Sequence, residues 1–213
     1  MSLMVGMRRL AAIAAVVLAF AAAASPSRAE MFGKQETPYT DLRPFPKWTG
    51  VLDRYFRELG QREGNCASPD FNRCHYKEWQ AFIEKMRAEP RDRQLEHVNT
   101  FFNRRRYIVD PINWGVADYW ETPGQFFAKN GDCEDYAIAK YMTLRDLGWA
   151  VADMRVVVVQ DMNLNLVHAV LAVADGGRTQ ILDNQLAVLV EPRRIKHYRP
   201  IYAVNEEGWW RFH

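Results

Sequence analysis

Three residues suited to acyl transfer occur in one order along the chain, as Cys133, His168 and Asp183. A cysteine thiolate can attack a carbonyl carbon, an imidazole can collect and return the proton, and a carboxylate can hold the imidazole in one tautomer. The three residues are far enough apart for each to lie on its own element, and close enough to belong to one compact unit. Together, in this order, they predict a cysteine hydrolase.

The candidate nucleophile, Cys133, is predicted to lie in the first turn of a helix. Thr122-Pro123 favours the start of a short helix, and Asn130-Gly131 favours its end. Asp132 can then cap a second helix, which stops at Gly148. The unpaired N–H groups and the positive end of the helix dipole favour a thiolate there. A buried inert thiol or an intermolecular disulfide is the alternative for a leftover cysteine.

His168 is the candidate general base because it lies in an apolar run, residues 166–171, that is typical of a buried strand. A polar ring in such a place costs free energy unless it has a partner. A hairpin signal at residues 175–178 puts Asp183 on the next strand, within cross-strand reach of the imidazole. The alternatives are a structural core histidine and an aspartate that caps a turn. The other histidines lie in polar or terminal segments: His75, His97, His197 and His213.

Three carboxylates surround the candidate nucleophile, those of Asp132, Glu134 and Asp135. Their negative charges oppose a thiolate and would raise the pKa of the thiol. A hard divalent cation such as calcium, held by these oxygens, would cancel the repulsion and rigidify the start of the helix. The alternative is that these acids only cap the helix and favour its dipole.

Helical and strand patterns divide the chain into two halves. Apolar residues recur at helical spacing in residues 48–59, 76–88 and 91–107. Beyond Gly148 the pattern becomes that of strands, at 154–160, 166–174, 179–184 and 199–205. Connections this short make consecutive strands antiparallel. We therefore expect an α+β fold, with N-terminal helices and the nucleophile-bearing helix packed on an antiparallel sheet.

Two segments lack a regular pattern. Residues 30–46 contain three prolines and few apolar residues, and are expected to form an extended arm on the surface. Residues 108–121 contain Pro111, Gly115 and three aromatic side chains, and lead directly into the segment of Cys133. They form either one wall of an active-site cleft or a packed loop beneath the core helix.

Residues 1–29 have the pattern of a secretory signal peptide. Arg8-Arg9 precede an uncharged apolar run, and Ser27-Arg28-Ala29 places small residues at the −3 and −1 positions of a cleavage site. The apolar run is short for a membrane span, and an uncleaved anchor is the alternative. We expect residues 1–29 to be a signal peptide and residues 30–213 to form a single domain outside the cytoplasm.

The net charge depends on that leader. Residues 1–29 contain three arginines and no acid, so their removal changes the formal charge from +2 to −1. The remaining chain has no general electrostatic footprint for nucleic acid. No nucleic-acid partner is therefore expected.

Three cysteines in an exported chain suggest one disulfide and one free thiol. Cys66 and Cys74 flank a short polar loop and can close on each other. A metal site built from Cys66, Cys74 and His75 is the alternative, but it lacks a fourth ligand at any usual zinc spacing. Cys133 is then the odd cysteine.

Several of these motifs together resemble one known family. They are Gly-Asp-Cys-Glu-Asp-Tyr at 131–136, the apolar strand of His168, Leu-Asp-Asn at 182–184, the Cys66, Cys74 and Trp79 spacing, and the ending at 202–210. The chain resembles the bacterial transglutaminase-like cysteine proteinases. The resemblance implies a papain-like, transglutaminase-like fold, a triad of Cys133, His168 and Asp183, and calcium bound beside the nucleophile. Asp132 and Glu134, followed by Asp135, are the expected calcium ligands.

The best-understood branch of that family, the LapG-type proteases, acts in the periplasm. These enzymes cut near the N-terminus of very large surface adhesins and release them, and an inner-membrane receptor for cyclic di-GMP sequesters the protease. The resemblance implies a calcium-dependent cysteine endopeptidase that controls biofilm attachment in this way. Two alternatives are a transglutaminase or amidase that acts on glutamine side chains with the same triad, and a non-catalytic binding module on the same fold.

Overall fold

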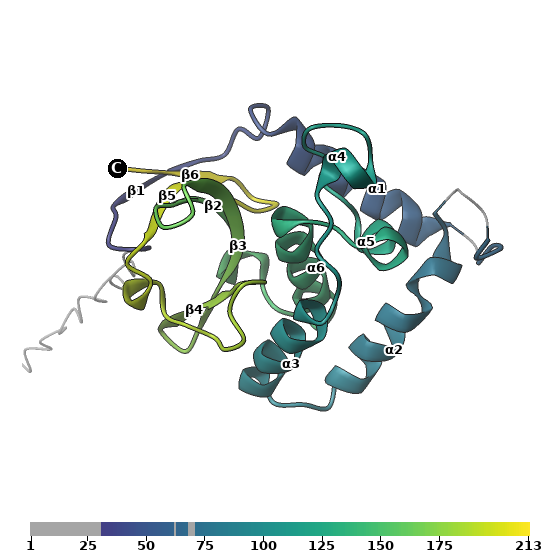
Figure 1. Cartoon of the computed structure of the whole chain (residues 1–213). Coiled ribbons are helices and arrows are strands. Elements are labelled where there is room, and N and C mark those ends of the chain that lie inside the picture. The colour runs from purple at the N-terminus through teal and green to yellow at the C-terminus, as the bar shows by residue number, and fades with distance from the viewer. Residues whose placement is uncertain (1–30, 62, 68–70) are drawn as a thin grey trace, which may run out of the picture.

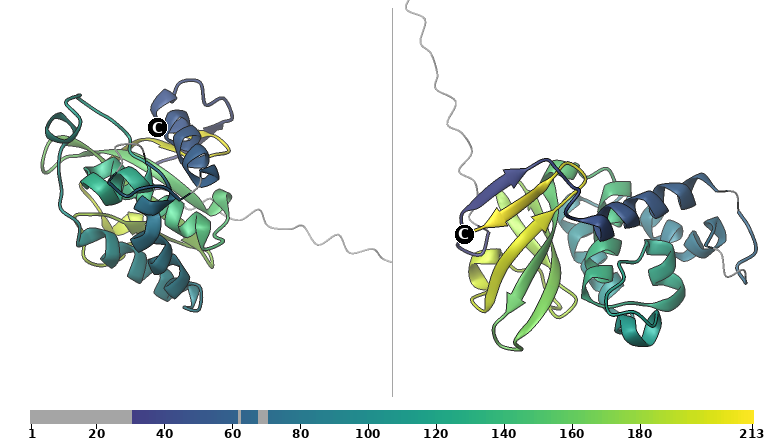
Figure 2. Two further views of the ribbon diagram at one scale, coloured as in Figure 1. Left: turned by 90° about the vertical axis from the view of Figure 1, so that its right-hand side faces the viewer. Right: turned by 90° about the horizontal axis from the view of Figure 1, so that it is seen from above.

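The structure is a computed structural model and describes residues 31–61, 63–67 and 71–213. A curved sheet forms one side of the molecule and a layer of helices forms the other, with helix α6 between them (Figures 1 and 2). The predicted signal peptide, residues 1–29, lies outside the described residues. None of the described helices is long and apolar enough to cross a membrane.

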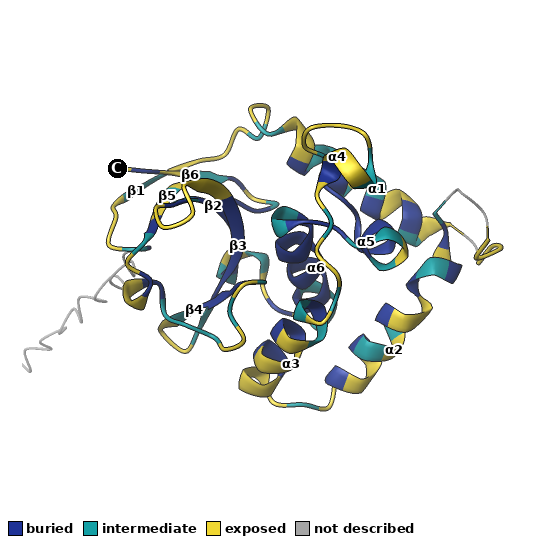
Figure 3. Cartoon of the chain, in the orientation of Figure 1, coloured by how far each residue is buried: buried dark blue, intermediate teal, exposed yellow. Residues whose placement is uncertain are grey.

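In the described residues, six α-helices make up the helical side. They are α1 (Pro46–Gly60), α2 (Lys77–Met86), α3 (Arg91–Asn103), α4 (Asp110–Asn113), α5 (Pro123–Lys129) and α6 (Cys133–Asp146). Three short 3-10 turns lie at Arg73–Tyr76, Val151–Asp153 and Pro192–Arg194. Helices α1 and α2 each bury one apolar face, whereas α6 is buried all round from Asp135 to Leu144 (Figure 3). Helix α6 is therefore the centre of the domain.

One antiparallel sheet holds all six strands, in the order β1-β6-β5-β2-β3-β4. The strands are β1 (Glu36–Tyr39), β2 (Met154–Asp161), β3 (Leu166–Asp175), β4 (Arg178–Leu182), β5 (Tyr198–Val204) and β6 (Trp209–Phe212). Val159 lies opposite His168, and Leu171 lies opposite Leu182. The predicted fold of helices and an antiparallel sheet is confirmed.

Both faces of the sheet are buried. Met154, Val156, Leu171 and Val173 pack with α6 and the helical layer. Alternate residues of the same strands form a second cluster on the other face: Val157, Val159, Val170 and Ala172. Strands buried on both faces explain why β2 is a run of valines rather than an alternating pattern.

Two details differ from the sequence-based expectation. The arm at residues 30–46 contains a strand, β1, which pairs with β6 so that Thr37 lies opposite Arg211. This pairing places residues 36–39 beside residues 209–212, and no local sequence pattern predicts it. Strand β4 ends at Leu182 rather than Asn184, because Asp183 Oδ1 accepts the backbone N–H of Gln185 and bends the chain. Asp183 therefore lies just beyond the strand.

Cys66 and Cys74 form the predicted disulfide, with their Cα atoms 5.1 Å apart. The bridge lies in the connection between α1 and α2, at the end of the helical layer far from the sheet (Figure 1). Cys133 is the free cysteine.

Replacement of both Cys66 and Cys74 by serine should lower the free energy of unfolding by roughly 2–3 kcal/mol, because the unfolded chain regains the entropy of a closed loop. Urea denaturation measures this change. The rate of alkylation of Cys133 should stay unchanged, since the disulfide is remote from α6. A double variant as stable as the parent would contradict the prediction.

Candidate active site

The start of α6 is held in place by the carboxylate of Asp135. Its Oδ2 accepts the backbone N–H of Asp132 at 3.0 Å, and its Oδ1 accepts that of Glu121 at 2.8 Å. Residue 131 has to be glycine, because a Cβ atom there would overlap the Asp135 carboxylate. Asp132 occupies the predicted N-cap position, and Cys133 is the first residue of the helix.

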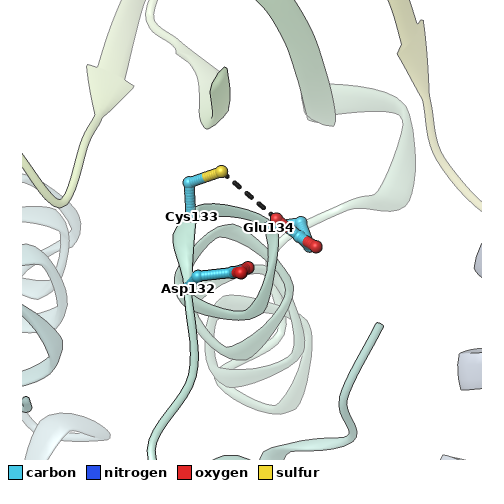
Figure 4. Close-up of side chains that lie close together, drawn as sticks. All are labelled: Asp132, Cys133 and Glu134. Carbon is cyan, nitrogen blue, oxygen red and sulfur yellow. Dashed lines mark hydrogen bonds between the residues drawn. The ribbon is translucent and has the colours of Figure 1, made fainter. Parts of the chain in front are cut away.

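The half-buried side chain of Cys133 lies among polar groups. Its thiol donates to Glu134 Oε2 at 3.2 Å (Figure 4). The backbone N–H of Ala169 in β3 and the hydroxyl group of Tyr107 also lie near the sulfur. Among the described residues, no hydrogen bond joins the sulfur to His168.

Burial raises the pKa of the Cys133 thiol far above its ordinary value, and the negative charge of Glu134 and the bond to it raise the pKa further. The N–H of Ala169 acts in the opposite direction. The dipole at a helix start, which by itself favours a thiolate, is outweighed by the burial of the thiol and by the adjacent carboxylate of Glu134. The thiol of Cys133 is therefore neutral in this structure.

His168 and Asp183 form a buried pair, with Nε2 2.9 Å from Oδ1. Asp183 Oδ1 also accepts the N–H of Gln185 at 2.9 Å, and Oδ2 accepts the hydroxyl group of Tyr198 at 2.7 Å. Burial alone would raise the pKa of Asp183, but the bond and charge of His168 outweigh it and lower the pKa. With Asp183 ionised, Nε2 carries the proton of this bond, and Nδ1 is left for proton transfer.

His168 belongs to β3, whereas Cys133 approaches this strand from the start of α6. The imidazole packs beside Tyr198, with ring centroids 5.7 Å apart. Strand β4 pairs with β3 only as far as Leu171, so the described residues leave the adjoining edge of β3 without a strand partner. The sulfur lies near the N–H of Ala169, the residue after His168. Cys133 therefore lies beside the strand that carries His168.

Two further carboxylates, from Asp110 and Asp118, lie beside those that flank Cys133. The chain is brought there because the N–H of Ile108 donates to the carbonyl of Gly131 at 2.9 Å. Oxygens of Asp110, Asp118 and Glu134 lie within 4.8 Å of one another, as do oxygens of Asp110, Asp132 and Asp135. We call these five residues the acidic cluster: Asp110, Asp118, Asp132, Glu134 and Asp135.

Mutual repulsion in the acidic cluster shows in its pKa values. Burial raises the pKa of Glu134 to about 9, and the hydrogen bond and charge of Asp132 add to the shift. Burial likewise raises the pKa of Asp110 to about 6 and that of Asp135 well above its ordinary value. Carboxylates this close cannot all be ionised together. At neutral pH the cluster must hold either protons or a cation.

The donor atoms of the acidic cluster fit a hard divalent cation. Asp110 Oδ1 and Asp132 Oδ1 are buried and have no hydrogen-bond partner among the described residues. Buried oxygens without a partner are costly, and a cation would satisfy them. Both oxygens of Asp135 already accept backbone N–H groups. Asp135 therefore has a structural role at the start of α6. Its role as a calcium ligand stays a prediction.

Asp110 and Asp118 are not among the ligands expected from the sequence. Both belong to the irregular segment 108–121, for which the sequence allows either a cleft wall or a packed loop. The segment lies against the start of α6, where the N–H of Asp110 donates to Asp132 Oδ2 at 3.3 Å. The one available signal was an acidic, irregular stretch directly before the nucleophile. The contact itself depends on tertiary structure.

A free thiol at the start of a central helix, packed on an antiparallel sheet, is the arrangement of a papain-like thiol peptidase. Comparison with protein families agrees: residues 65–209 match the family described as bacterial transglutaminase-like cysteine proteinase (BTLCP). The chain belongs to this family and is a cysteine peptidase with a transglutaminase-like fold.

Solved structures of one relative are similar to this chain. Legionella pneumophila LapG is 30% identical in sequence, with a TM-score of 0.59, and the match covers 76% of this chain and 87% of that one. Calcium-bound and EGTA-treated forms of LapG match equally well, with 86% and 84% of their chains covered. Comparison with curated protein sequences gave no match.

In a buffer with chelator, the free energy of unfolding should fall as the pH rises from about 5 to about 7. The folded protein keeps protons on Glu134 and Asp110 where the unfolded chain, with ordinary carboxyl pKa values, has lost them. Stability is therefore greatest at the acidic end of this window. Urea denaturation at each pH measures the slope, and Glu134→Gln should flatten it. A flat or rising profile for the parent protein would show that the pKa values of the acidic cluster are not raised in the folded state.

Proposed function

We propose that the chain is an exported, calcium-dependent cysteine endopeptidase that uses Cys133, His168 and Asp183 as a catalytic triad. The observation that carries this proposal is the buried pair of His168 and Asp183, one residue along β3 from the point where the Cys133 sulfur meets the strand. Membership of a cysteine peptidase family supports it. A protein is the substrate class of such an enzyme.

In this mechanism each residue has one role. Cys133 attacks the carbonyl carbon of the scissile peptide bond, and His168 takes the thiol proton at Nδ1 while Nε2 stays bonded to Asp183. His168 returns the proton to the leaving amine, and the acyl group remains on the sulfur. A water molecule, activated by His168, then releases the acyl group and restores the thiol. A backbone N–H near Cys133, at the start of α6, would stabilise the oxyanion.

Calcium is proposed to bind in the acidic cluster, with Asp110, Asp118, Asp132 and Glu134 as ligands and Asp135 as a fifth candidate. Two buried oxygens without a partner, on Asp110 and Asp132, support this site. So do the calcium-bound and EGTA-treated forms of LapG. When bound, calcium would offset the repulsion among these carboxylates and supply positive charge beside the Cys133 thiol.

The proposed substrate is the N-terminal region of a large surface adhesin, whose release would control biofilm attachment. An inner-membrane receptor for cyclic di-GMP is the proposed regulatory partner. Both come from the resemblance to LapG-type proteases and from the likeness to LapG. The periplasm is the corresponding location. It agrees with the signal-peptide pattern of residues 1–29, which would leave residues 30–213 as the single mature domain.

Cys133→Ala and His168→Ala should each abolish cleavage of a protein substrate, and Asp183→Asn should lower kcat by about a thousandfold or more because it leaves the imidazole in the wrong tautomer. His97→Ala, at an exposed position of α3, is the matched control and should keep full activity. Mass spectrometry of surface proteins incubated with each variant measures the products. Full activity of Cys133→Ala would exclude the assigned nucleophile.

An amine donor in the same assay should form no crosslink; crosslinking would instead support a transglutaminase.

EGTA should lower the proteolytic rate, and added calcium should restore it. Calcium at a hundredfold excess over its Kd should also stabilise the folded protein by about 2.7 kcal/mol. Glu134→Gln and Asp118→Asn should both weaken calcium binding in isothermal titration calorimetry, whereas Asp92→Asn, an exposed acid on α3, should not. Full activity of the metal-stripped enzyme would refute calcium dependence.

A further inference from the structure

Lys140 is fully buried in the middle of α6 (0% exposed). Lysine is almost never buried completely unless it is paired, because removal of the ammonium group from water is costly. Among the described residues, no carboxylate forms an ion pair with it. Its Nζ donates instead to two neutral acceptors of α3, Asn99 Oδ1 at 2.8 Å and Asn103 Oδ1 at 2.7 Å.

These two asparagines hold the segment that follows β4. Asn103 Nδ2 donates to the backbone carbonyl of Asp183 at 2.7 Å and to that of Leu186 at 3.0 Å. Asn99 Nδ2 donates to the same Leu186 carbonyl at 3.0 Å. Lys140 Nζ donates both hydrogen bonds, so each amide has to turn its oxygen inward. Each amide then presents its N–H groups to the chain at residues 183–186.

The position of Asp183 depends on contacts of this kind. It lies one residue beyond the end of β4, where the hydrogen bonds of the sheet no longer hold the backbone. Tyr198 and Gln185 bond to its side chain, whereas Asn103 bonds to its backbone. Burial lowers the pKa of Lys140 to about 7, and the negative charge of Asp183 acts against this shift. The side chain of Asn103 therefore links Lys140 to the backbone of Asp183, whose carboxylate bonds to His168.

We propose that Lys140 is a positioning residue for proteolysis: acting through Asn99 and Asn103, it holds the backbone of Asp183 so that the carboxylate keeps the His168 imidazole oriented. This inference rests on the proposed catalytic role of Asp183. A lysine that merely joined α6 to α3 would affect stability but not the chemical step. The two roles can be separated by experiment.

The test compares Lys140→Met, which keeps the length of the side chain, with Thr143→Val one turn further along α6. Thr143 is equally buried and bonds to Trp79 and to the carbonyl of Ala139, with no link to Asp183. Both variants should lower the melting temperature. At an assay temperature well below both melting points, Lys140→Met should lower kcat by about 10- to 100-fold with little change in KM, because the imidazole is misplaced. Thr143→Val should keep both constants within about twofold of the parent.

A spectroscopic measurement adds a second readout. The imidazole N–H signal of His168 in proton–nitrogen NMR, assigned with His168→Ala, should shift in Lys140→Met and stay in place in Thr143→Val. Asn103→Ala, at a half-buried position, should lower kcat in the same way and carries the test if Lys140→Met does not fold. The double variant Lys140→Met/Asn103→Ala should be no slower than the slower single variant, since both changes break one relay.

Three results would overturn the inference: unchanged kcat in Lys140→Met, an equal loss of kcat in Thr143→Val, or multiplied losses in the double variant. Cys133→Ala is measured beside them. An inactive Cys133→Ala with a fully active Lys140→Met would reject the positioning role alone. An active Cys133→Ala would reject the proposed mechanism itself.

Discussion

The repulsion among carboxylates packed around a half-buried thiol is the constraint to which the rest of this structure responds. Like charges in a poorly solvated place are stable only if protons or a cation neutralise them. The start of α6 places Glu134 against the Cys133 sulfur, and the segment before it adds Asp110 to the same space. The reactivity of the thiol is consequently linked to whatever neutralises these acids. A helix start alone would lower the pKa of the thiol. Here burial and the carboxylate of Glu134 raise it instead.

The rest of the fold holds that crowded place rigidly between two layers. Helix α6 is buried along its length, so its first residue is positioned by packing on both sides (Figure 3). The sheet contributes an open edge of β3, since β4 stops at Leu182 and leaves room for the sulfur at Ala169. The same early stop frees Asp183 from the sheet, and side chains have to hold it. Lys140 and Tyr198 approach it from opposite layers, one through an asparagine and one directly.

Much of this fold could be predicted from local pattern. The helix that begins at Cys133 was predictable because Asn130-Gly131 ends one helix and Asp132 caps the next. The hairpin of β3 and β4 was predictable from its glycine turn. Strand β1 was not, because the strand it pairs with, β6, comes more than 160 residues later in the chain. The end of β4 was missed for a different reason: a side-chain bond of Asp183, rather than a change in hydrophobic pattern, bends the chain there.

The sequence by itself determined which groups are available: one unpaired cysteine at a helix start, a histidine in an apolar strand, and acids beside the cysteine. These follow from local propensity and periodicity, which act over a few residues. Only the tertiary structure decided how the groups meet. Asp110 joins the acidic cluster, and Lys140 is buried behind Asp183, through contacts between segments tens of residues apart. Such contacts depend on how helices and sheet pack, and packing is a property of the whole chain that no local pattern encodes.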